Sequence, residues 1–392
     1  MATDPGIPSD VSEVTTGWLR RALCMGRGGE SPALESVEVE NIATEPGLFS
    51  EVRRCLLEWR DNHPLCPTTM ILKMHSSDPK TFRMGRRFRL YRREYDYYRH
   101  VAPLSPLRSP TLYWGNFANR THRFALVLED MSLTHQAPLS NSATPTEAQT
   151  AIRAAAHLHA RYWNNVHEPH LAPFPDYLKQ LRRLVQLGYL AYLPRVLSRF
   201  GDCFSDEQKR LAESYGMRIA DHMDDMATGP RTFTHGDFRS ANLFLEDGDG
   251  GSATAIDWQN CGMHSGLRDV TYFLSTSVSP QVRREIERDT LEEYHRALRV
   301  SGVEDYSFDD CWRDYRRVML SCLIGPVITC GALELADASS YQTMRTGLQR
   351  TLAAVEELGA DEFLPHRRRL FTVSNMFSVG SKAAYGVHKS MR

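Results

Sequence analysis

Three segments in the first part of the chain have the apolar and polar patterns of β-strands. Val37 and Val39 alternate with charged residues, residues 51–59 form a second such segment, and residues 68–74 form a third that carries Lys73. Aromatic residues then recur at helical spacing and place Glu94 near the buried face of a helix. They are Phe88, Tyr91, Tyr95 and Tyr98. This order predicts a small lobe built from a sheet and one helix.

After this lobe the pattern becomes mainly helical. Residues 124–128 are apolar and predict one more strand, whereas Thr144-Pro-Thr-Glu147 is a capping box that starts a helix. The uncharged run 319–333 is short for a membrane span and is interrupted by Gly325 and Pro326, so it predicts a buried, kinked helix. A chain of 392 residues exceeds the size at which one core usually divides. We therefore expect an α+β fold with two lobes, the larger one mainly helical.

Two short apolar segments flank a polar loop in the second half of the chain. Thr232 and Phe233 precede the loop, and residues 243–245 follow it. Residues 253–256 predict a second strand beyond a turn rich in Gly and Asp. The loop carries Asp237 and Asn242, and Asp257 ends the hairpin. The hairpin is therefore expected to bring these three polar side chains to one end.

An acid, an amide and a second acid in this order suit phosphoryl transfer from a nucleotide. Kinases use one carboxylate to accept the proton of the attacking hydroxyl, an Asn five residues later as a metal ligand, and a downstream Asp that binds Mg²⁺. Asp237, Asn242 and Asp257 occupy these places. Each residue alone could equally be a solvated turn former.

The small lobe offers candidates for the nucleotide phosphates. In kinases a strand Lys holds the α- and β-phosphates and is oriented by a helix Glu, which favours Lys73 and Glu94. Each alone would usually be a surface residue. The phosphate-covering loop is expected at residues 44–50, where Gly47 would let the backbone approach a phosphate and Ser50 would add a donor.

These motifs resemble those of the aminoglycoside phosphotransferase and choline kinase superfamily, and most closely its ecdysteroid-kinase-like branch. The residues that carry the resemblance are Val127-Leu-Glu-Asp-Met131, His235-Gly-Asp237, Ile256-Asp257-Trp-Gln259 and Asp269-Val-Thr-Tyr-Phe-Leu-Ser-Thr276. The resemblance implies a bilobal protein-kinase-like fold, with a nucleotide-binding lobe over residues 1–131 and a catalytic and substrate lobe over 132–392. It implies ATP and Mg²⁺ as cofactors.

The resemblance also assigns roles to further residues. Backbone groups of Glu129 and Met131 would meet the adenine at the hinge between the lobes. Asp269 would be a buried acceptor for the catalytic loop, although a helix N-cap is the alternative. Arg239, two residues after Asp237, would stabilise charge that develops on the transferring phosphate, unless it points to solvent or to an acidic neighbour.

Features that the sequence lacks favour a small acceptor. A protein kinase would carry His-Arg-Asp, Asp-Phe-Gly and an activation segment. Here Gly236 replaces that Arg, and only eleven residues separate Asp257 from Asp269. We expect a small-molecule alcohol to be phosphorylated. A non-catalytic nucleotide-binding module of the same fold is the alternative, although Asp237, Asn242 and Asp257 are all retained.

The acceptor itself is predicted from one helical segment. Residues 177–192 are aromatic, aliphatic and cationic, with Arg182 and Arg183 and no carboxylate. A polycationic sugar would require an acid-lined cleft, so the segment favours a neutral or apolar, steroid- or terpenoid-like alcohol. A choline- or aminoglycoside-type kinase for a cationic substrate stays open, because the same aromatic residues could belong to the core.

Composition agrees with an ordinary cytoplasmic enzyme. The formal net charge of −1 argues against a nucleic-acid-binding protein. The eight cysteines form no C-x-x-C pair and are expected to be reduced. The N-terminus has neither a basic region nor an apolar core, so no signal peptide is expected, nor is a transmembrane segment. Residues 366–392 are basic and predict a partly ordered tail that could contact an anion or a membrane surface.

Overall fold

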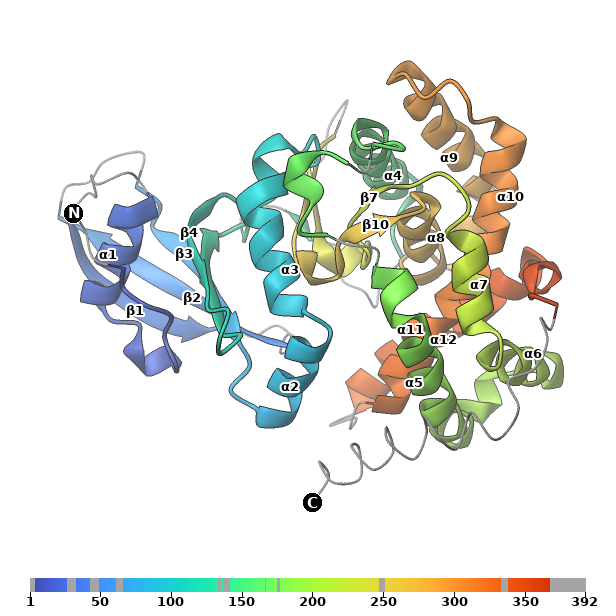
Figure 1. The fold of residues 1–392 in the computed structure, drawn as a ribbon, viewed down its shortest axis with the longest axis horizontal. Helices are drawn as coiled ribbons and strands as arrows, with labels where there is room; N and C mark the ends of the chain where they lie inside the picture. The colour runs from blue at the N-terminus through green and yellow to red at the C-terminus, as the bar shows by residue number, and fades with distance from the viewer. Residues whose placement is uncertain are drawn as a thin grey trace.

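The structure is a computed structural model that describes residues 4–26, 33–42, 49–60, 66–132, 135–136, 142–165, 167–174, 177–246, 251–332 and 338–366. Gly47 and the basic segment after His366 lie outside these residues. A sheet with one covering helix forms one end of the molecule, helices form the other end, and α2 (Pro79–Arg87) and α3 (Leu90–Asp96) lie between them (Figure 1).

The N-terminal part is built on a five-stranded antiparallel sheet with the strand order β1-β2-β3-β5-β4. Its strands are β1 (Leu34–Asn41), β2 (Ser50–Trp59), β3 (Thr69–His75), β4 (Leu112–Phe117) and β5 (Phe124–Glu129). Four of them cover the segments that alternation and apolar runs predicted. The predicted antiparallel sheet is confirmed.

The two faces of this sheet belong to different cores. Ala125 and Val127 of β5 face the core that contains α1 (Thr16–Gly26), where Trp18 packs edge-on against Trp114 at 5.1 Å. Alternate residues of the same strand, Phe124, Leu126 and Leu128, belong to the core shared with α3 and the helical part. Because side chains alternate across a strand, β5 connects the two cores.

The predicted aromatic helix forms from Leu90 onward as α3 and continues into a π-type turn, Tyr97–Val101. Phe88 lies outside it, as the C-cap of α2, because Arg89 has a left-handed backbone that separates the two helices. Tyr91 stacks on Phe124 of β5 at 4.9 Å, so the aromatic stripe does face the sheet. Glu94 lies on the same side and is only 1% exposed. The prediction that this helix buries Glu94 is therefore correct.

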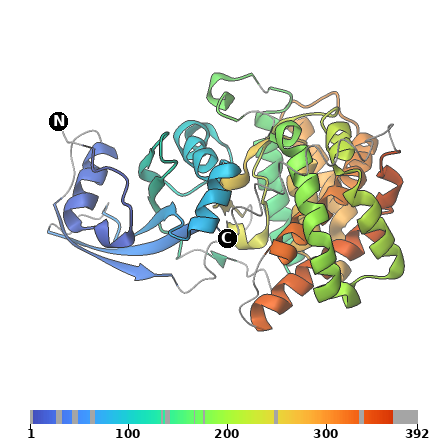
Figure 2. The same cartoon turned by 60° about the horizontal axis from the view of Figure 1, so that its bottom comes forward.

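The C-terminal part is mainly helical (Figure 2). Its α-helices are α4 (Pro145–Arg161), α5 (Tyr177–Phe200), α6 (Asp206–Gly216), α7 (Ile219–Met226), α8 (Leu267–Thr276), α9 (Pro280–Val300), α10 (Phe308–Met319), α11 (Ile324–Ala332) and α12 (Ala338–Glu357). Both bonds of the predicted capping box at Thr144 are present.

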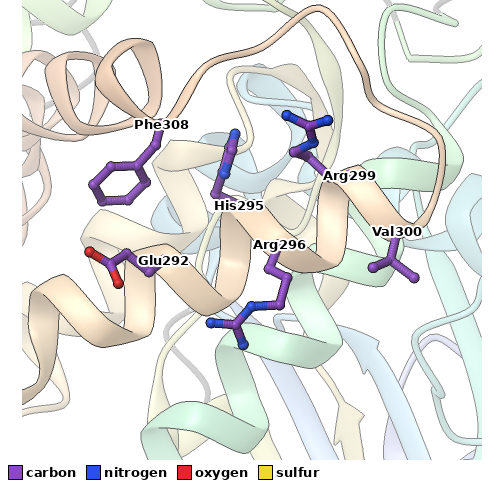
Figure 3. A pocket seen from close by; sticks show the side chains of 6 residues that line it. All are labelled: Glu292, His295, Arg296, Arg299, Val300 and Phe308. Carbon is purple, nitrogen blue, oxygen red and sulfur yellow. The ribbon is translucent and has the colours of Figure 1, made fainter.

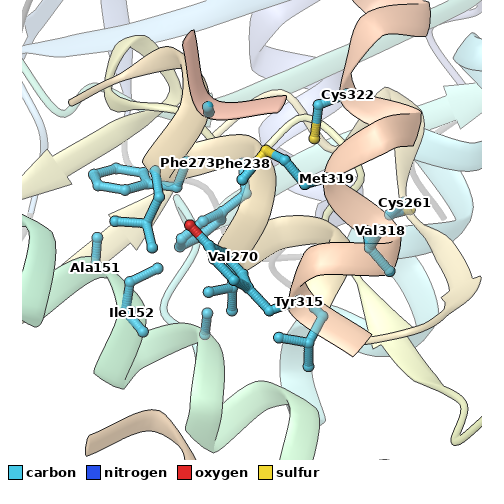
Figure 4. Close-up of a cluster of buried hydrophobic side chains, with 14 of the residues drawn as sticks. Ala151, Ile152, Phe238, Cys261, Val270, Phe273, Tyr315, Val318, Met319 and Cys322 are labelled. Atoms are coloured by element: carbon cyan, nitrogen blue, oxygen red, sulfur yellow. The ribbon is translucent and has the colours of Figure 1, made fainter. Parts of the chain in front are cut away.

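The core of this part surrounds α8 and α10, where Val270 and Phe273 pack with Tyr315 and Met319 (Figure 4). The predicted kinked helix at residues 319–333 is two helices: α10 ends at Met319, a 3-10 turn covers Leu320–Leu323, and α11 follows. Pro326 lies in the first turn of α11, where no backbone donor is lost. Among the described residues, no helix has both the length and the apolar character that a bilayer span needs.

Candidate active site

The predicted hairpin forms at the boundary between the sheet and the helices. β7 (Thr232–Thr234) leads into a loop over residues 235–242, which we call the 235–242 loop, and β8 (Leu243–Leu245) pairs antiparallel with β9 (Ala253–Ala255). The backbone N–H of Ile256 donates to the carbonyl of Asn242 at 2.9 Å. This bond places Asp257 directly beside the end of the loop.

Gly236 makes the turn at the start of the loop possible. Its φ is +82°, and a Cβ at this position would lie 2.2 Å from the backbone carbonyl oxygen of Asn260. Only glycine fits such a backbone without moving the segment that follows Asp257. This contact gives a steric reason for His-Gly-Asp in place of His-Arg-Asp.

Asp237 and Asn242 meet across the loop as their spacing predicted. The Asn242 amide donates to the Asp237 backbone carbonyl at 2.9 Å and to its carboxylate Oδ2 at 3.1 Å. Arg239 lies on the same carboxylate, with Nε 3.4 Å from Oδ1, and the negative charge of Asp237 raises the pKa of Arg239. The sequence left open whether Arg239 points to the phosphate, to solvent or to an acidic neighbour, and in the structure it contacts an acidic neighbour, Asp237. A carboxylate held in this way can accept a proton from a bound hydroxyl.

Asp257 lies opposite this loop in a constrained backbone. Its φ of +63° is in the left-handed region, which Asp tolerates better than most residues. The Gln259 amide donates to Oδ2 at 3.1 Å. Non-glycine residues in this region often mark functional sites, where surrounding contacts hold the strained conformation.

Lys73, Glu94 and Asp257 form one buried cluster, although they are far apart in sequence. The Lys73 ammonium lies 2.7 Å from Glu94 and 2.6 Å from Asp257. Burial alone would lower the pKa of Lys73, but the two carboxylates outweigh burial and raise it. Burial would raise the pKa of Asp257, but the charge of Lys73 outweighs burial and lowers the pKa of Asp257 below its usual value. At Glu94 burial outweighs the charge of Lys73, so the pKa of Glu94 is raised. Lys73 is therefore a fixed positive charge.

Trp258 locks this cluster against α3, a role that the sequence did not reveal. Its ring stacks on Tyr97 at 3.7 Å with an interplanar angle of 7°, and the ring of His235 lies 4.5 Å from it. The indole N–H donates to the carbonyl of Ala255 at 2.9 Å. Because Trp258 follows Asp257, the stack fixes that carboxylate relative to both α3 and the 235–242 loop.

Asp269 of α8 supports the start of the 235–242 loop through hydrogen bonds to its backbone. It is fully buried and accepts the backbone N–H groups of His235 and Gly236, at 2.7 and 2.9 Å. The N-cap of α8 is Gly266, so the alternative interpretation of Asp269 as an N-cap is wrong. His159 of α4 lies 3.3 Å from Asp269 and 2.9 Å from the Tyr294 hydroxyl. Its place on the buried stripe of α4 could be predicted, but its partners, 110 and 135 residues away, could not.

The predicted adenine and phosphate-loop residues lie at opposite ends of inner strands of the N-terminal sheet, since Ser50 pairs with His75 at the end of β3 and Glu129 pairs with Met70 at its start. Glu129 uses its backbone N–H to bond the Thr111 carbonyl at 2.9 Å, and its carboxylate pairs with Arg108 at 3.0 Å. Any contact of its backbone with adenine would therefore use the carbonyl. Met131 is buried. Ser50 begins β2, and its hydroxyl is buried without a hydrogen-bond partner among the described residues.

The donor set at the hairpin fits a magnesium ion. Asn242 and Asp257 offer oxygen atoms, and Mg²⁺ is bound in many phosphotransfer sites by one or two protein oxygens together with water and phosphate. Among the described residues, no group of three His, Cys, Asp or Glu side chains able to hold a metal occurs.

A separate hollow lies on the helical end and contains none of these residues. It is lined by α9 and the start of α10, with Glu292, His295, Arg296, Arg299, Val300 and Phe308 around it (Figure 3). Phe308, from the start of α10, lies beside Glu292 and His295 of α9 in this groove. None of the predicted site residues lines it.

Comparison with known proteins agrees with this geometry. Three solved structures match over nearly their whole length. A choline kinase from Cryptosporidium parvum has 11% identity and a TM-score of 0.53, and the match covers 84% of this chain and 92% of that one. An ethanolamine kinase from Plasmodium vivax has 10% identity and a TM-score of 0.51, with 90% of each chain covered. A Ralstonia eutropha protein provisionally named an aminoglycoside phosphotransferase has 13% identity and a TM-score of 0.52, with 88% of this chain and 97% of that one covered. The chain matches none of the curated proteins.

At these identities the solved structures establish the fold, which confirms the predicted α+β, protein-kinase-like architecture. The family is established separately, by a family model that covers residues 48–302, more than half of the chain. The chain belongs to the ecdysteroid kinase-like family.

Proposed function

We propose that this protein transfers the γ-phosphate of ATP to a hydroxyl group of a small molecule. The observation that carries the proposal is the convergence of Lys73, Glu94 and Asp257 with Asp237 and Asn242 at one hairpin. Phosphoryl transfer needs little covalent chemistry from the protein and depends on positioning and on charge stabilisation. A fixed cation, two metal-binding oxygens and a separate carboxylate supply both.

Each side chain then has a defined task. Lys73, kept charged by its two carboxylates, holds the α- and β-phosphates, and Glu94 orients it. Asn242 and Asp257 would hold Mg²⁺, which neutralises charge on the phosphate oxygens. Asp237 orients the acceptor hydroxyl and accepts its proton. The guanidinium of Arg239 offsets the charge of that carboxylate in the resting site, and it can turn to the transferring phosphate.

The nucleotide base is proposed to lie at the hinge that ends β5, near Glu129 and Met131, with Ser50 and Gly47 on the phosphate side. We accordingly divide the chain at Met131 into a nucleotide-binding lobe and a catalytic and substrate lobe. The free state of all eight cysteines supports a cytoplasmic site of action.

We propose a neutral alcohol as the acceptor. The structure weakens the sequence argument from Arg182 and offers a different one near Asp237. Arg182 pairs with Asp224 at 3.0 Å, so its charge is not available to repel a cation. The stronger support lies beside Asp237, where burial and the charge of Asp237 raise the pKa of Tyr272. With Arg239 and Tyr272 as neighbours, this carboxylate offers little to a polycation.

The proposal is tested by a pooled-metabolite screen with labelled ATP and Mg²⁺, read by the mass of phosphorylated products. Steroid or terpenoid alcohols, choline and kanamycin-like sugars are then compared at equal concentration in a coupled ADP assay. Stimulation by neutral alcohols supports both parts of the proposal. Selective stimulation by the cationic compounds would overturn the acceptor class alone, and no stimulated ATP turnover in any pool would favour a non-catalytic nucleotide-binding module.

A further inference from the structure

A small cavity lies behind the 235–242 loop, between the strands that carry the loop and the helices below them. It is lined by Arg231, His264, Ser265, Arg268 and Ser321, and by apolar side chains from the end of α7 and from α10. Arg231 precedes β7, and His264 ends β10 (Gly262–His264), which pairs with β7. Arg268 lies in the first turn of α8, directly before the loop support Asp269.

Two polar atoms of this cavity, on His264 and Arg268, are buried without a hydrogen-bond partner among the described residues. His264 is 4% exposed, and its Nδ1 has no hydrogen-bond partner among the described residues. The Nε of Arg268 is also buried without a partner there. Arg268 makes one hydrogen bond in the described part of the chain, from Nη2 to the carbonyl of Gly236 at 3.4 Å, and no carboxylate there lies within ion-pair distance of it. Arg231 donates to the carbonyl of Met263 at 2.5 Å.

The charge around the cavity is positive. Burial, and then the charges of Arg268, Arg231 and Arg93, lower the pKa of His264 well below its usual value. His264 is therefore neutral and can donate one hydrogen bond, and the charges that lower its pKa belong to guanidinium groups. The N-terminal end of α8 adds partial positive charge. The Arg268 guanidinium is partly buried, and its buried Nε has lost water without gaining an acceptor among the described residues, which is costly for a cation.

The dimensions of the cavity limit what can supply the counter-charge. About 10 Å³ is open to the centre of a water-sized particle, so the cavity accommodates one particle of about that size. A phosphate or a carboxylate is too large. Water fits, but it brings no charge. A monatomic anion satisfies both limits.

We propose that this cavity binds a small monovalent inorganic anion of the chloride class, held by Arg268 and His264 and attracted by Arg231. The bound anion offsets the charge of Arg268 and fixes this side chain, whose Nη2 donates to the carbonyl of Gly236 beside Asp237. Anion binding would thereby hold the 235–242 loop in the geometry described above. Arg268 is a positioning residue in this proposal.

Binding is tested on the full-length protein with ³⁵Cl NMR line broadening during a chloride titration at constant ionic strength, with gluconate as the replacing anion. The expected result is saturable broadening that bromide competes away. Arg268→Gln should weaken chloride binding by at least about tenfold, since it removes a charge-assisted hydrogen bond. Arg99→Gln, which changes an exposed arginine outside the cavity, should leave chloride binding unchanged.

A second readout protects the test against a variant that fails to fold. Anomalous diffraction from wild-type crystals soaked in bromide should show one site between Arg268 and His264. Water alone at that position, or line broadening that persists in Arg268→Gln, would overturn the proposal. These binding arms do not depend on the proposed kinase activity.

A third arm rests on the proposed function and measures ATP turnover in chloride against gluconate. The wild type should be faster in chloride by at least about twofold, and Arg268→Gln should lose this difference. Equal turnover of the wild type in both anions, alongside confirmed binding, would overturn only the coupling to the loop.

Discussion

Replacing Gly236 with alanine tests whether the close contact between the 235–242 loop and the segment after Asp257 is a steric requirement. Two effects should add. An L-residue with positive φ costs roughly 1–2 kcal/mol. The new Cβ would also lie 2.2 Å from the carbonyl oxygen of Asn260, a backbone atom that cannot rotate away. Such overpacking costs about 1–3 kcal/mol, so the free energy of unfolding should fall by about 2–5 kcal/mol.

The chain offers a matched control for the backbone effect alone. Gly302 has a φ of +96°, and a Cβ there would meet nothing within 4 Å. Gly302→Ala should therefore cost only the roughly 1–2 kcal/mol of backbone strain. Both variants are compared with the wild type by urea unfolding monitored by circular dichroism, and by ATP turnover. Only Gly236→Ala should lose turnover beyond its loss of stability, because the clash separates Asp237 from Asp257.

Equal destabilisation by the two alanine substitutions would refute this reasoning. In that case the segment after Asp257 would move aside at no cost, and the close contact would not explain the glycine. Restored turnover at low temperature in Gly236→Ala would likewise show that the variant is impaired only in stability.

Three further predictions concern the metal, the buried cluster and pH. Asp257→Ala should abolish the Mg²⁺-dependent thermal stabilisation by ATP, and an unchanged melting shift would contradict the metal role. Lys73→Met leaves the buried Glu94 and the half-buried Asp257 without their cation, so it should cost about 3–5 kcal/mol in urea unfolding, whereas exposed Lys80→Met should cost little. Burial lowers the pKa of His222 from 6.5 to about 4. Between pH 4 and 6.5 the unfolded state therefore binds more protons than the folded state, so the free energy of unfolding should decrease by about 3 kcal/mol or less as pH falls from 6.5 to 4. His222→Gln should flatten this dependence of the free energy of unfolding on pH.

Local patterns predicted much of the fold because they report short-range physics. Alternation and apolar runs predicted four of the five strands of the N-terminal sheet, and the capping box at Thr144 marked the start of α4. The break between α10 and α11 was misplaced: residues 319–333 were predicted as one kinked helix, whereas the turn falls at Leu320–Leu323, before Gly325 and Pro326. Proline in the first turn of a helix does not interrupt it, so the prediction put the break at the wrong residue.

The site was predictable where its residues are close in sequence or share a motif. Asp237, Asn242 and Asp257 were found by spacing, and the small-molecule kinase class agrees with the family. The stack of Tyr97 on Trp258 and the bond of His159 to Asp269 join segments more than 100 residues apart. No local pattern records such pairs, and the same holds for the cationic cavity behind the loop. The roles of the individual site residues stay predictions.

The central claim is that Asp237 accepts the proton of the acceptor hydroxyl during phosphoryl transfer. Asp237→Asn preserves the size of the side chain and removes its basicity. Once the screen has supplied an acceptor, turnover of this variant should fall on the order of 100-fold or more, while nucleotide binding measured by calorimetry is retained. Exposed Asp361→Asn is the matched control. Near-normal turnover of Asp237→Asn would contradict the claim.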